Sequence, residues 1–208
     1  MLTIGVTGGA GAGKSAILDH ICEVFGDSCL VIKADDVANT VKLKGEEGYE
    51  PVVALLGEGI LGPDLEIDRK KMAAALFGSR KLIDRVNGIL HPIVNRRILG
   101  EIERERQRGV YDIVFIEAAL LIENGYDRFT DEMWYIYASE DTRRNRLRST
   151  RGYDDDRIEG IFAAQLKEEE NRKAADLVID NDGDKETAFR QTDEAIRDRI
   201  GGLLYAKR

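Results

Sequence analysis

Five short apolar segments, rich in β-branched residues, recur along the chain and predict strands. They cover residues 2–6, 29–32, 113–116, 133–138 and 177–179. Stretches with helical periodicity separate these segments, and such alternation is typical of a parallel sheet covered by helices on both faces. The clearest helix follows the first strand, where apolar residues recur at helical spacing from Ile17 to Phe25 and Gly26 ends the pattern. The pattern therefore predicts an α/β fold with a mainly parallel five-stranded sheet.

One connection between predicted strands is too long for a simple crossover. Residues 36–109 carry only helical patterns, for example at 70–77 and 82–90. The prolines at positions 51, 63 and 92 are expected to break these helices, because proline lacks the N–H that a helix interior needs. We interpret this segment as a helical insertion into the sheet-forming part of the chain.

A second connection, residues 139–174, is so densely charged that little of it can belong to a core. It predicts a mobile cover, or lid. The whole chain, 1–208, is then a single domain with an insertion and a lid. Its sheet-forming core is expected to comprise residues 1–35, 110–138 and 175–208.

Composition limits the classes of partner. The 208 residues are 43% hydrophobic and 34% charged, as in an ordinary soluble protein. With 31 basic and 39 acidic residues, the net charge of −8 gives no sequence-wide argument for binding nucleic acid or an anionic membrane. No signal peptide or membrane-spanning apolar run is recognisable, and Cys22 and Cys29 fit no CxxC pattern. We expect a cytoplasmic protein, a monomer or weak homo-oligomer, with both cysteines packed in the interior.

Glycine is concentrated between the first strand and the first helix, where five glycines occupy nine positions in GVTGGAGAGKSAIL. The pattern Gly8-x-x-x-x-Gly13-Lys14-Ser15 matches a P-loop in its strand-loop-helix setting. Residues without a Cβ let backbone N–H groups turn inward around phosphate oxygens, and the helix N-terminus adds a favourable field. Lys14 is expected to reach the β- and γ-phosphates and the Ser15 hydroxyl to bind Mg²⁺. The predicted nucleotide-binding residues are Gly11, Ala12, Gly13, Lys14, Ser15 and Ala16.

Acidic residues follow two of the predicted strands, at the carboxyl edge where open parallel sheets carry their sites. Asp35 and Asp36 follow the second strand, and Glu117 ends the third. Asp35 is the predicted acid/base that accepts a proton from a substrate hydroxyl. Asp36 is an alternative for that role, or it caps a helix beginning near Val37. Glu117 is placed to hold Mg²⁺ through its water shell, or it caps the next turn.

Five arginines fall within nine residues of the predicted lid, at positions 143, 144, 146, 148 and 151. Such a run is usually a solvated surface, and some of these side chains are expected to pair with the acids at 154–156. In phosphoryl transfer, however, arginines that close over the transferred group stabilise its charge. Arg143, Arg146 and Arg151 are the candidates, and the sequence does not rank them.

Several separated stretches together resemble the dephospho-CoA kinase family, over nearly the whole chain. They are Gly5–Gly9 running into the P-loop, Ala34-Asp35, Ile67–Lys71 with Phe77 and Asn87, Ile89-Leu90-His91-Pro92, Leu120–Glu123, Gln165, and Ala175–Gly183. The P-loop alone fits many NTPases. The His-Pro and Ala-Asp-Leu-Val-Ile-Asp-Asn stretches are far more specific.

The resemblance implies a three-layer P-loop NTPase fold and phosphorylation of the ribose 3′-hydroxyl of dephospho-CoA by ATP with Mg²⁺. In this interpretation Asp35 is the general base, Lys14, Arg146 and Arg151 act on the transferred group, and residues 36–109 bind the substrate. His91, Glu117 and Leu120 are implied to line the substrate site. From spacing alone, His91 is instead a structural residue at a break between helices before Pro92.

The chain also departs from the family pattern at three positions. Lys33, Ala119 and Ile161 stand where an Asp, a Pro and an Arg, respectively, are more usual.

Two other interpretations of the function remain. A P-loop kinase for another small metabolite or nucleoside hydroxyl would use the same loop and base. A GTP-dependent switch would need Asn-Lys-x-Asp after a strand, but Asn181-Asp182-Gly183-Asp184 has the wrong second residue.

Overall fold

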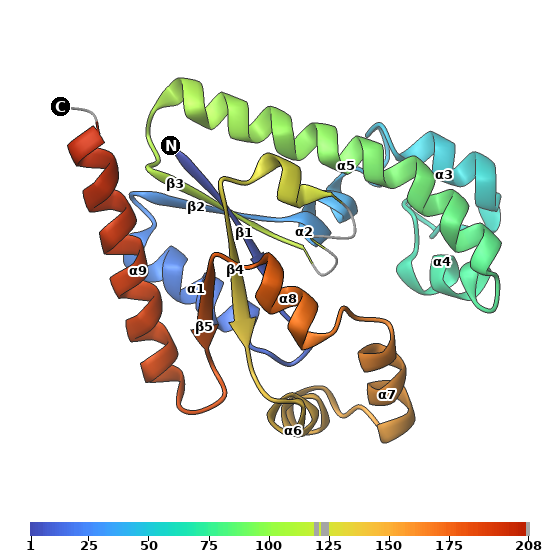
Figure 1. Ribbon diagram of the computed structural model, residues 1–208. Helices are drawn as coiled ribbons and strands as arrows, with labels where there is room; N and C mark the ends of the chain where they lie inside the picture. Colours follow the sequence, from blue (N-terminus) through green and yellow to red (C-terminus); the bar gives the residue numbers. More distant parts are fainter. Residues whose placement is uncertain (119–120, 122–124, 207–208) are drawn as a thin grey trace. The chain divides into compact units, whose positions relative to one another are not determined.

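The computed structural model describes residues 1–118, 121 and 125–206 (Figure 1). It divides into two compact units. The first comprises Met1–Ile32 with Glu105–Arg208 and contains the sheet, and the second comprises Lys33–Arg104 and is helical. Among the described residues, no helix is both long enough and apolar enough to span a bilayer.

The sheet is parallel and has five strands in the order β2-β3-β1-β4-β5, which confirms the predicted α/β fold. The strands are β1 (Leu2–Thr7), β2 (Cys29–Lys33), β3 (Ile113–Glu117), β4 (Glu132–Tyr137) and β5 (Leu177–Asp180). Each lies within one or two residues of its predicted position. β1 is central and pairs with both β3 and β4, so the loop that follows β1 emerges at the middle of the sheet edge.

One face of the sheet packs against α1 (Lys14–Phe25) and α9 (Lys185–Ala206), which lie side by side in Figure 1. The apolar positions that predicted α1 supply its buried face through Ile17, Leu18 and Ile21. Trp134 of β4 is fully buried there, and its ring meets the edge of Phe115 at 5.3 Å between centroids. α1 ends at Gly26, as predicted.

The opposite face of β4 is covered by α8 (Glu168–Ala174), the last of three helices in the predicted lid segment. The Arg172 guanidinium lies 4.4 Å from the centroid of the Tyr137 ring. α6 (Glu140–Arg151) and α7 (Asp155–Ala163) precede α8. Each begins at a side-chain cap, because the Ser139 hydroxyl accepts the Thr142 N–H at 3.3 Å and the Asp154 carboxylate accepts the Arg157 N–H at 2.9 Å.

The helical unit contains four helices, with the short 3₁₀ turn η1 (Glu58–Ile60) between the second and third. They are α2 (Ala34–Thr40), α3 (Tyr49–Leu56), α4 (Arg69–Leu76) and α5 (Arg80–Arg108), which runs on past the end of the unit. α4 begins at a side-chain cap, since Asp68 accepts the Lys71 N–H at 2.8 Å. This hydrogen bond, with a smaller contribution from the Lys70 N–H, lowers the pKa of Asp68.

The prediction that prolines break the helices of this unit was wrong at two of three positions. Pro51 lies in the first turn of α3, where its missing N–H has no helical partner to lose. Pro92 lies inside α5, so His91 is not at a break between helices. The buried residues Val94 and Ile98 show that α5 has an apolar face, whose packing outweighs the lost hydrogen bond.

Two further expectations need correction. α2 begins at Ala34 rather than near Val37, so Asp36 is a residue of the first turn and not the cap. Cys22 is exposed on α1, whereas Cys29 is buried as predicted. Burial, with smaller contributions from Asp112 and Cys22, raises the pKa of the Cys29 thiol to about 12.

Candidate active site

The loop between β1 and α1 is shaped by glycines with left-handed backbone conformations. Gly11 has φ 82°, and Gly13, which precedes the first residue of α1, has φ 93°. A Cβ on Gly13 would lie 2.2 Å from the Asn181 amide nitrogen. Side chains at these positions would be strained and, at Gly13, would also collide with Asn181. The glycines therefore allow both the curvature of the loop and the close approach of the chain after β5.

Lys14, the first residue of α1, turns back over this loop. Its ammonium group donates a hydrogen bond to the Gly8 carbonyl at 2.6 Å and lies 3.9 Å from the Glu117 carboxylate. Glu117 ends β3 and pairs in register with Val6 of β1. The structure thus brings together the lysine and the strand-end acid that the sequence singled out.

The oxygen donors at this edge suit a small hard cation. Ser15 is exposed in the first turn of α1, and the Glu117 carboxylate is 15% exposed. Within the described parts of the chain, no group of three or more His, Cys, Asp or Glu residues could hold a metal ion. Mg²⁺ needs no such cage, because it keeps several waters and takes phosphate oxygens as ligands. A hydroxyl and a carboxylate beside a phosphate-binding loop fit that requirement.

Two arginines of α6, in the segment predicted to be a lid, bind the backbone of the loop. Arg146 donates to the carbonyls of Gly11 and Ala12, both at 3.4 Å, and to the Asn181 carbonyl at 2.8 Å. Arg143 donates to the Ala10 carbonyl at 3.1 Å. Burial lowers the pKa of Arg143, but a guanidinium stays charged at any physiological pH. Both side chains hold the loop from α6.

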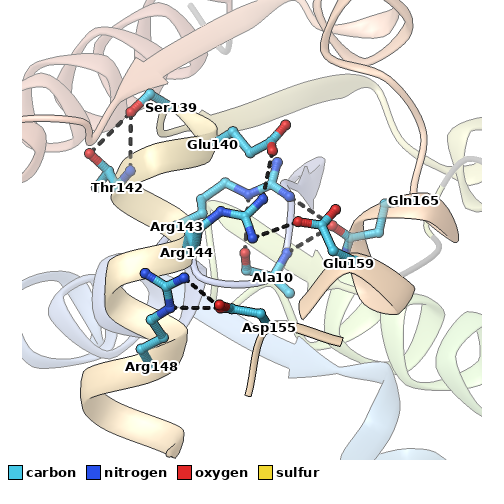
Figure 2. Close-up of polar contacts among 10 residues, drawn as sticks. All are labelled: Ala10, Ser139, Glu140, Thr142, Arg143, Arg144, Arg148, Asp155, Glu159 and Gln165. Carbon is cyan, nitrogen blue, oxygen red and sulfur yellow. Dashed lines mark hydrogen bonds and ion pairs between the residues drawn. The ribbon is translucent and has the colours of Figure 1, made fainter. Parts of the chain in front are cut away.

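The remaining lid arginines differ in their partners. Figure 2 shows Arg144 between Glu140 and Glu159, and Arg148 with Asp155. Arg151, at the end of α6, is exposed, and its side chain makes no hydrogen bond or ion pair with the rest of the described chain. Some arginines were expected to pair with the acids at 154–156. Among the described residues, Arg148 is the one that does so, with Asp155.

In the helical unit, Asp35 and Asp36 both lie exposed in the first turn of α2. The helix N-terminus favours a carboxylate at this place. Lys42, just beyond α2, has its pKa lowered by burial and by Arg69, and the charge of Asp35 opposes this shift. Asp35 therefore shares its surroundings with at least one cation. His91 is half-buried on α5, and Leu120 lies outside the described residues.

The helical unit also contains a cavity of about 210 Å³. It is lined by Val41, Glu46, Glu47, Ile93, Arg96, Arg97, Gly100 and Arg104. Arg96 pairs with Glu47, and Arg97 lies 3.4 Å from Glu46. Arg104 has no ion pair with any described residue. Three guanidinium groups against two carboxylates leave the lining with a net positive charge.

Sequence reasoning gave no role to two residues that contact the loop. The Gln165 side chain accepts the Ala10 N–H at 3.2 Å, and the Asn181 amide donates to the Ala12 carbonyl at 2.7 Å. Both residues lie in the stretches that carry the family resemblance, which was the only available signal. Contacts across more than 150 residues of chain cannot be recognised from local spacing.

The family of this chain follows from comparison with known proteins. The family model for dephospho-CoA kinase matches residues 2–187. The chain belongs to the dephospho-CoA kinase family. A dephospho-CoA kinase from Geobacillus kaustophilus is 35% identical over 190 residues, covering 91% of this chain and 92% of that protein. One from Geobacter sulfurreducens is 35% identical over 194 residues, covering 93% and 96%.

Two solved structures resemble this chain over almost its whole length. The crystal structure of TT1252 from Thermus thermophilus has a TM-score of 0.77 at 26% identity and covers 95% of this chain and 97% of that one. A dephospho-CoA kinase from Campylobacter jejuni has a TM-score of 0.71 and covers 97% and 98%. At 20% identity, this second likeness concerns the fold alone. The chain is accordingly a P-loop kinase of this family, and a GTP-dependent switch is not supported.

Proposed function

We propose that this protein transfers the γ-phosphoryl group of ATP to the ribose 3′-hydroxyl of dephospho-CoA, the reaction that completes coenzyme A. The observation that carries the proposal is the match to the dephospho-CoA kinase family over residues 2–187. The loop between β1 and α1, with Lys14 turned over it, is the local geometry that this reaction needs.

The triphosphate is held at the loop between β1 and α1. Backbone N–H groups of residues 11–16 surround the phosphate oxygens, and the N-terminus of α1 adds a positive field. Lys14 exchanges its contact with the Gly8 carbonyl for the β- and γ-phosphates, which a lysine binds as a compact charge. Ser15 and Glu117 hold Mg²⁺, directly or through water, and when bound the cation neutralises charge on the phosphates.

The acceptor is activated by Asp35. Its carboxylate takes the proton of the ribose hydroxyl as that oxygen attacks phosphorus, and ADP leaves in line. No covalent enzyme intermediate is needed. The helical unit binds the rest of dephospho-CoA, with His91 and Leu120 as proposed lining residues. The cation-rich cavity around Arg104 supports binding of an anionic part of that substrate.

The lid arginines divide into two roles. Arg146 is engaged with the carbonyls of the loop and so positions the phosphate site. Arg151 is exposed and has no ion pair with a described residue, so it is the arginine free to approach the transferred group. A guanidinium there offsets charge that spreads over the phosphoryl oxygens in the transition state.

A coupled assay of ADP release tests the proposal. Purified protein is supplied with Mg·ATP and, separately, with dephospho-CoA, adenosine, a nucleoside monophosphate or shikimate. We expect ADP release above the acceptor-free rate with dephospho-CoA and not with the other acceptors. Turnover with another alcohol and none with dephospho-CoA would replace the proposal with that of a different small-molecule kinase.

A further inference from the structure

One residue of the phosphate-binding loop, Ala10, has both its N–H and its carbonyl held by side chains of the segment 139–174. The N–H of Ala10 donates to the Gln165 side-chain oxygen at 3.2 Å. The carbonyl of Ala10 accepts from Arg143 Nε at 3.1 Å. Arg143 Nη2 also donates to the same Gln165 oxygen at 3.2 Å, which closes a ring of three hydrogen bonds (Figure 2). We call Arg143 and Gln165 the Ala10 clamp.

The clamp fixes two successive peptide planes. Because a peptide unit is planar and trans, holding the Ala10 carbonyl also sets the direction of the Gly11 N–H in the same plane. Holding the Ala10 N–H likewise sets the direction of the Gly9 carbonyl, which accepts the Ala12 N–H at 3.0 Å. The clamp thus orients backbone groups at the start of the segment that is proposed to surround the phosphates.

Glycine on both sides of Ala10 makes this contact possible. A Cβ on Gly9 would lie 2.4 Å from the Arg143 guanidinium carbon. A Cβ on Gly11 would lie 2.7 Å from the backbone oxygen of Arg143. α6 therefore packs directly on the loop backbone. The glycines serve this packing as well as the curvature of the loop.

The clamp depends on α7. The ring of Phe162, in α7, lies 4.3 Å from the Arg143 guanidinium, and Gln165 follows two residues after the helix. α7 is held against α6 by two ion pairs visible in Figure 2: Arg144 with Glu159 at 2.6 Å, and Arg148 with Asp155. A displacement of α7 would withdraw both Phe162 and Gln165 from the loop.

We propose that Arg143 and Gln165 are positioning residues that act on the phosphates through the backbone N–H and carbonyl of Ala10, so that the lid and the polyphosphate site are energetically coupled. They touch no reacting atom. When the clamp is broken, the loop retains its residues but loses its fixed peptide orientation, and polyphosphate binding weakens. This inference rests on the proposed use of ATP, but not on the identity of the acceptor.

The test measures the dissociation constant of Mg·ATP, and of inorganic tripolyphosphate, by calorimetry. Gln165→Leu removes the shared acceptor, and Arg143→Lys keeps the charge but loses the forked geometry. We expect each to weaken both ligands about tenfold, the loss typical of one charge-assisted hydrogen bond. The double variant should weaken them by little more than either single variant, because the two side chains bond to each other and to the backbone of the same residue.

A matched control exists on α9, where the Gln191 side chain accepts the Asp180 N–H at 3.1 Å and donates to the Asp180 carbonyl at 3.2 Å. Gln191→Leu should lower the free energy of unfolding but leave both dissociation constants unchanged.

Two results would overturn the proposed coupling. One is unchanged ligand affinity in Gln165→Leu and Arg143→Lys. The other is a double variant in which the two losses of affinity multiply as independent effects. If Gln165→Leu does not fold, Arg143→Lys decides. Turnover of dephospho-CoA by the parent enzyme is measured separately, so failure of the proposed reaction is distinguished from failure of the clamp.

Discussion

Asp35 and Lys14 have different chemical tasks in the proposed reaction, although both follow strands of the same sheet. Lys14 contacts the loop that is proposed to hold ATP, whereas Asp35 lies in the first turn of α2. The sequence singled out Lys14 through the P-loop pattern and Asp35 through its position after the second strand. It did not predict that α2 begins at Ala34, because three polar or small residues carry no periodic signal that separates a cap from a first turn.

Replacement of Asp35 by Asn should separate catalysis from nucleotide binding. The amide keeps the size of the side chain but accepts no proton from the ribose hydroxyl. We expect kcat to fall by about 10²–10⁴-fold while the dissociation constant of Mg·ATP stays within about twofold. Rapid-quench kinetics and calorimetry measure the two quantities. Near-normal turnover in Asp35→Asn would show that another group is the base.

Lys14→Ala, in contrast to Asp35→Asn, should impair both nucleotide binding and catalysis. Removal of the ammonium takes a positive charge from the phosphate site in both the bound state and the transition state. We expect weaker binding of Mg·ATP and slower turnover together. An unchanged affinity for ATP in this variant would contradict the assignment of the loop as the polyphosphate site.

Cys29 gives a prediction about pH. Its thiol pKa is raised from 9.0 to about 12 in the folded chain, chiefly by burial. The folded state therefore favours the protonated thiol, and its stabilising contribution is complete below pH 9 and is lost as the pH rises toward about 12. Urea unfolding at about pH 7 and about pH 10 should show lower stability at the higher pH. Cys29→Ala should lose less stability over that interval; an equal loss would assign the effect to other groups.

At the scale of elements, α5 is where sequence reasoning failed most clearly. Local rules place a break before Pro92, yet the helix continues from Arg80 to Arg108. Those rules describe a helix by its own hydrogen bonds, whereas α5 has buried apolar residues along much of its length. The strands were predicted correctly because apolar, β-branched runs report burial in a sheet directly. The partners of Arg143 and Gln165 were not, since they depend on tertiary contacts.

Pro92→Ala should stabilise α5. Residue 92 is exposed, so the substitution leaves no cavity, and alanine restores an N–H that can bond to the Gly88 carbonyl. We expect the free energy of unfolding to rise by about 1–3 kcal/mol. Chemical denaturation measures the change. A loss of stability would mean that proline relieves a strain at this turn of α5.

The cavity beside α5 predicts a selective effect on the acceptor. Arg104→Ala removes a guanidinium that has no ion pair with a described residue, so an anionic group bound there loses a partner. We expect the KM for dephospho-CoA to rise about three- to tenfold, with the KM for ATP unchanged. Arg85→Ala, an exposed arginine earlier on α5 and outside the cavity lining, is the matched control. Equal effects of the two variants would remove the cavity from the substrate site.

For the whole molecule, the sheet and its loop form one compact unit, and the helical segment forms a second. The sheet order places β1 at the centre, which puts the P-loop at the middle of the carboxyl edge, with Glu117 from the neighbouring strand beside it. This part of the site was predictable, because the rule for open parallel sheets depends only on strand order and direction. The substrate-binding role of the helical segment remains a proposal that rests on the family resemblance, since charged helices with no fixed motif carry no chemical signature of their own.

The most direct test of the central claim is identification of the product. The protein is incubated with Mg·ATP and dephospho-CoA, and the acceptor is then analysed by mass spectrometry and phosphorus NMR. The proposed function predicts one added phosphoryl group per acceptor, present as a 3′-phosphomonoester, and its absence when Asp35→Asn replaces the parent enzyme. Unmodified dephospho-CoA after prolonged incubation with active, ATP-binding protein would contradict it.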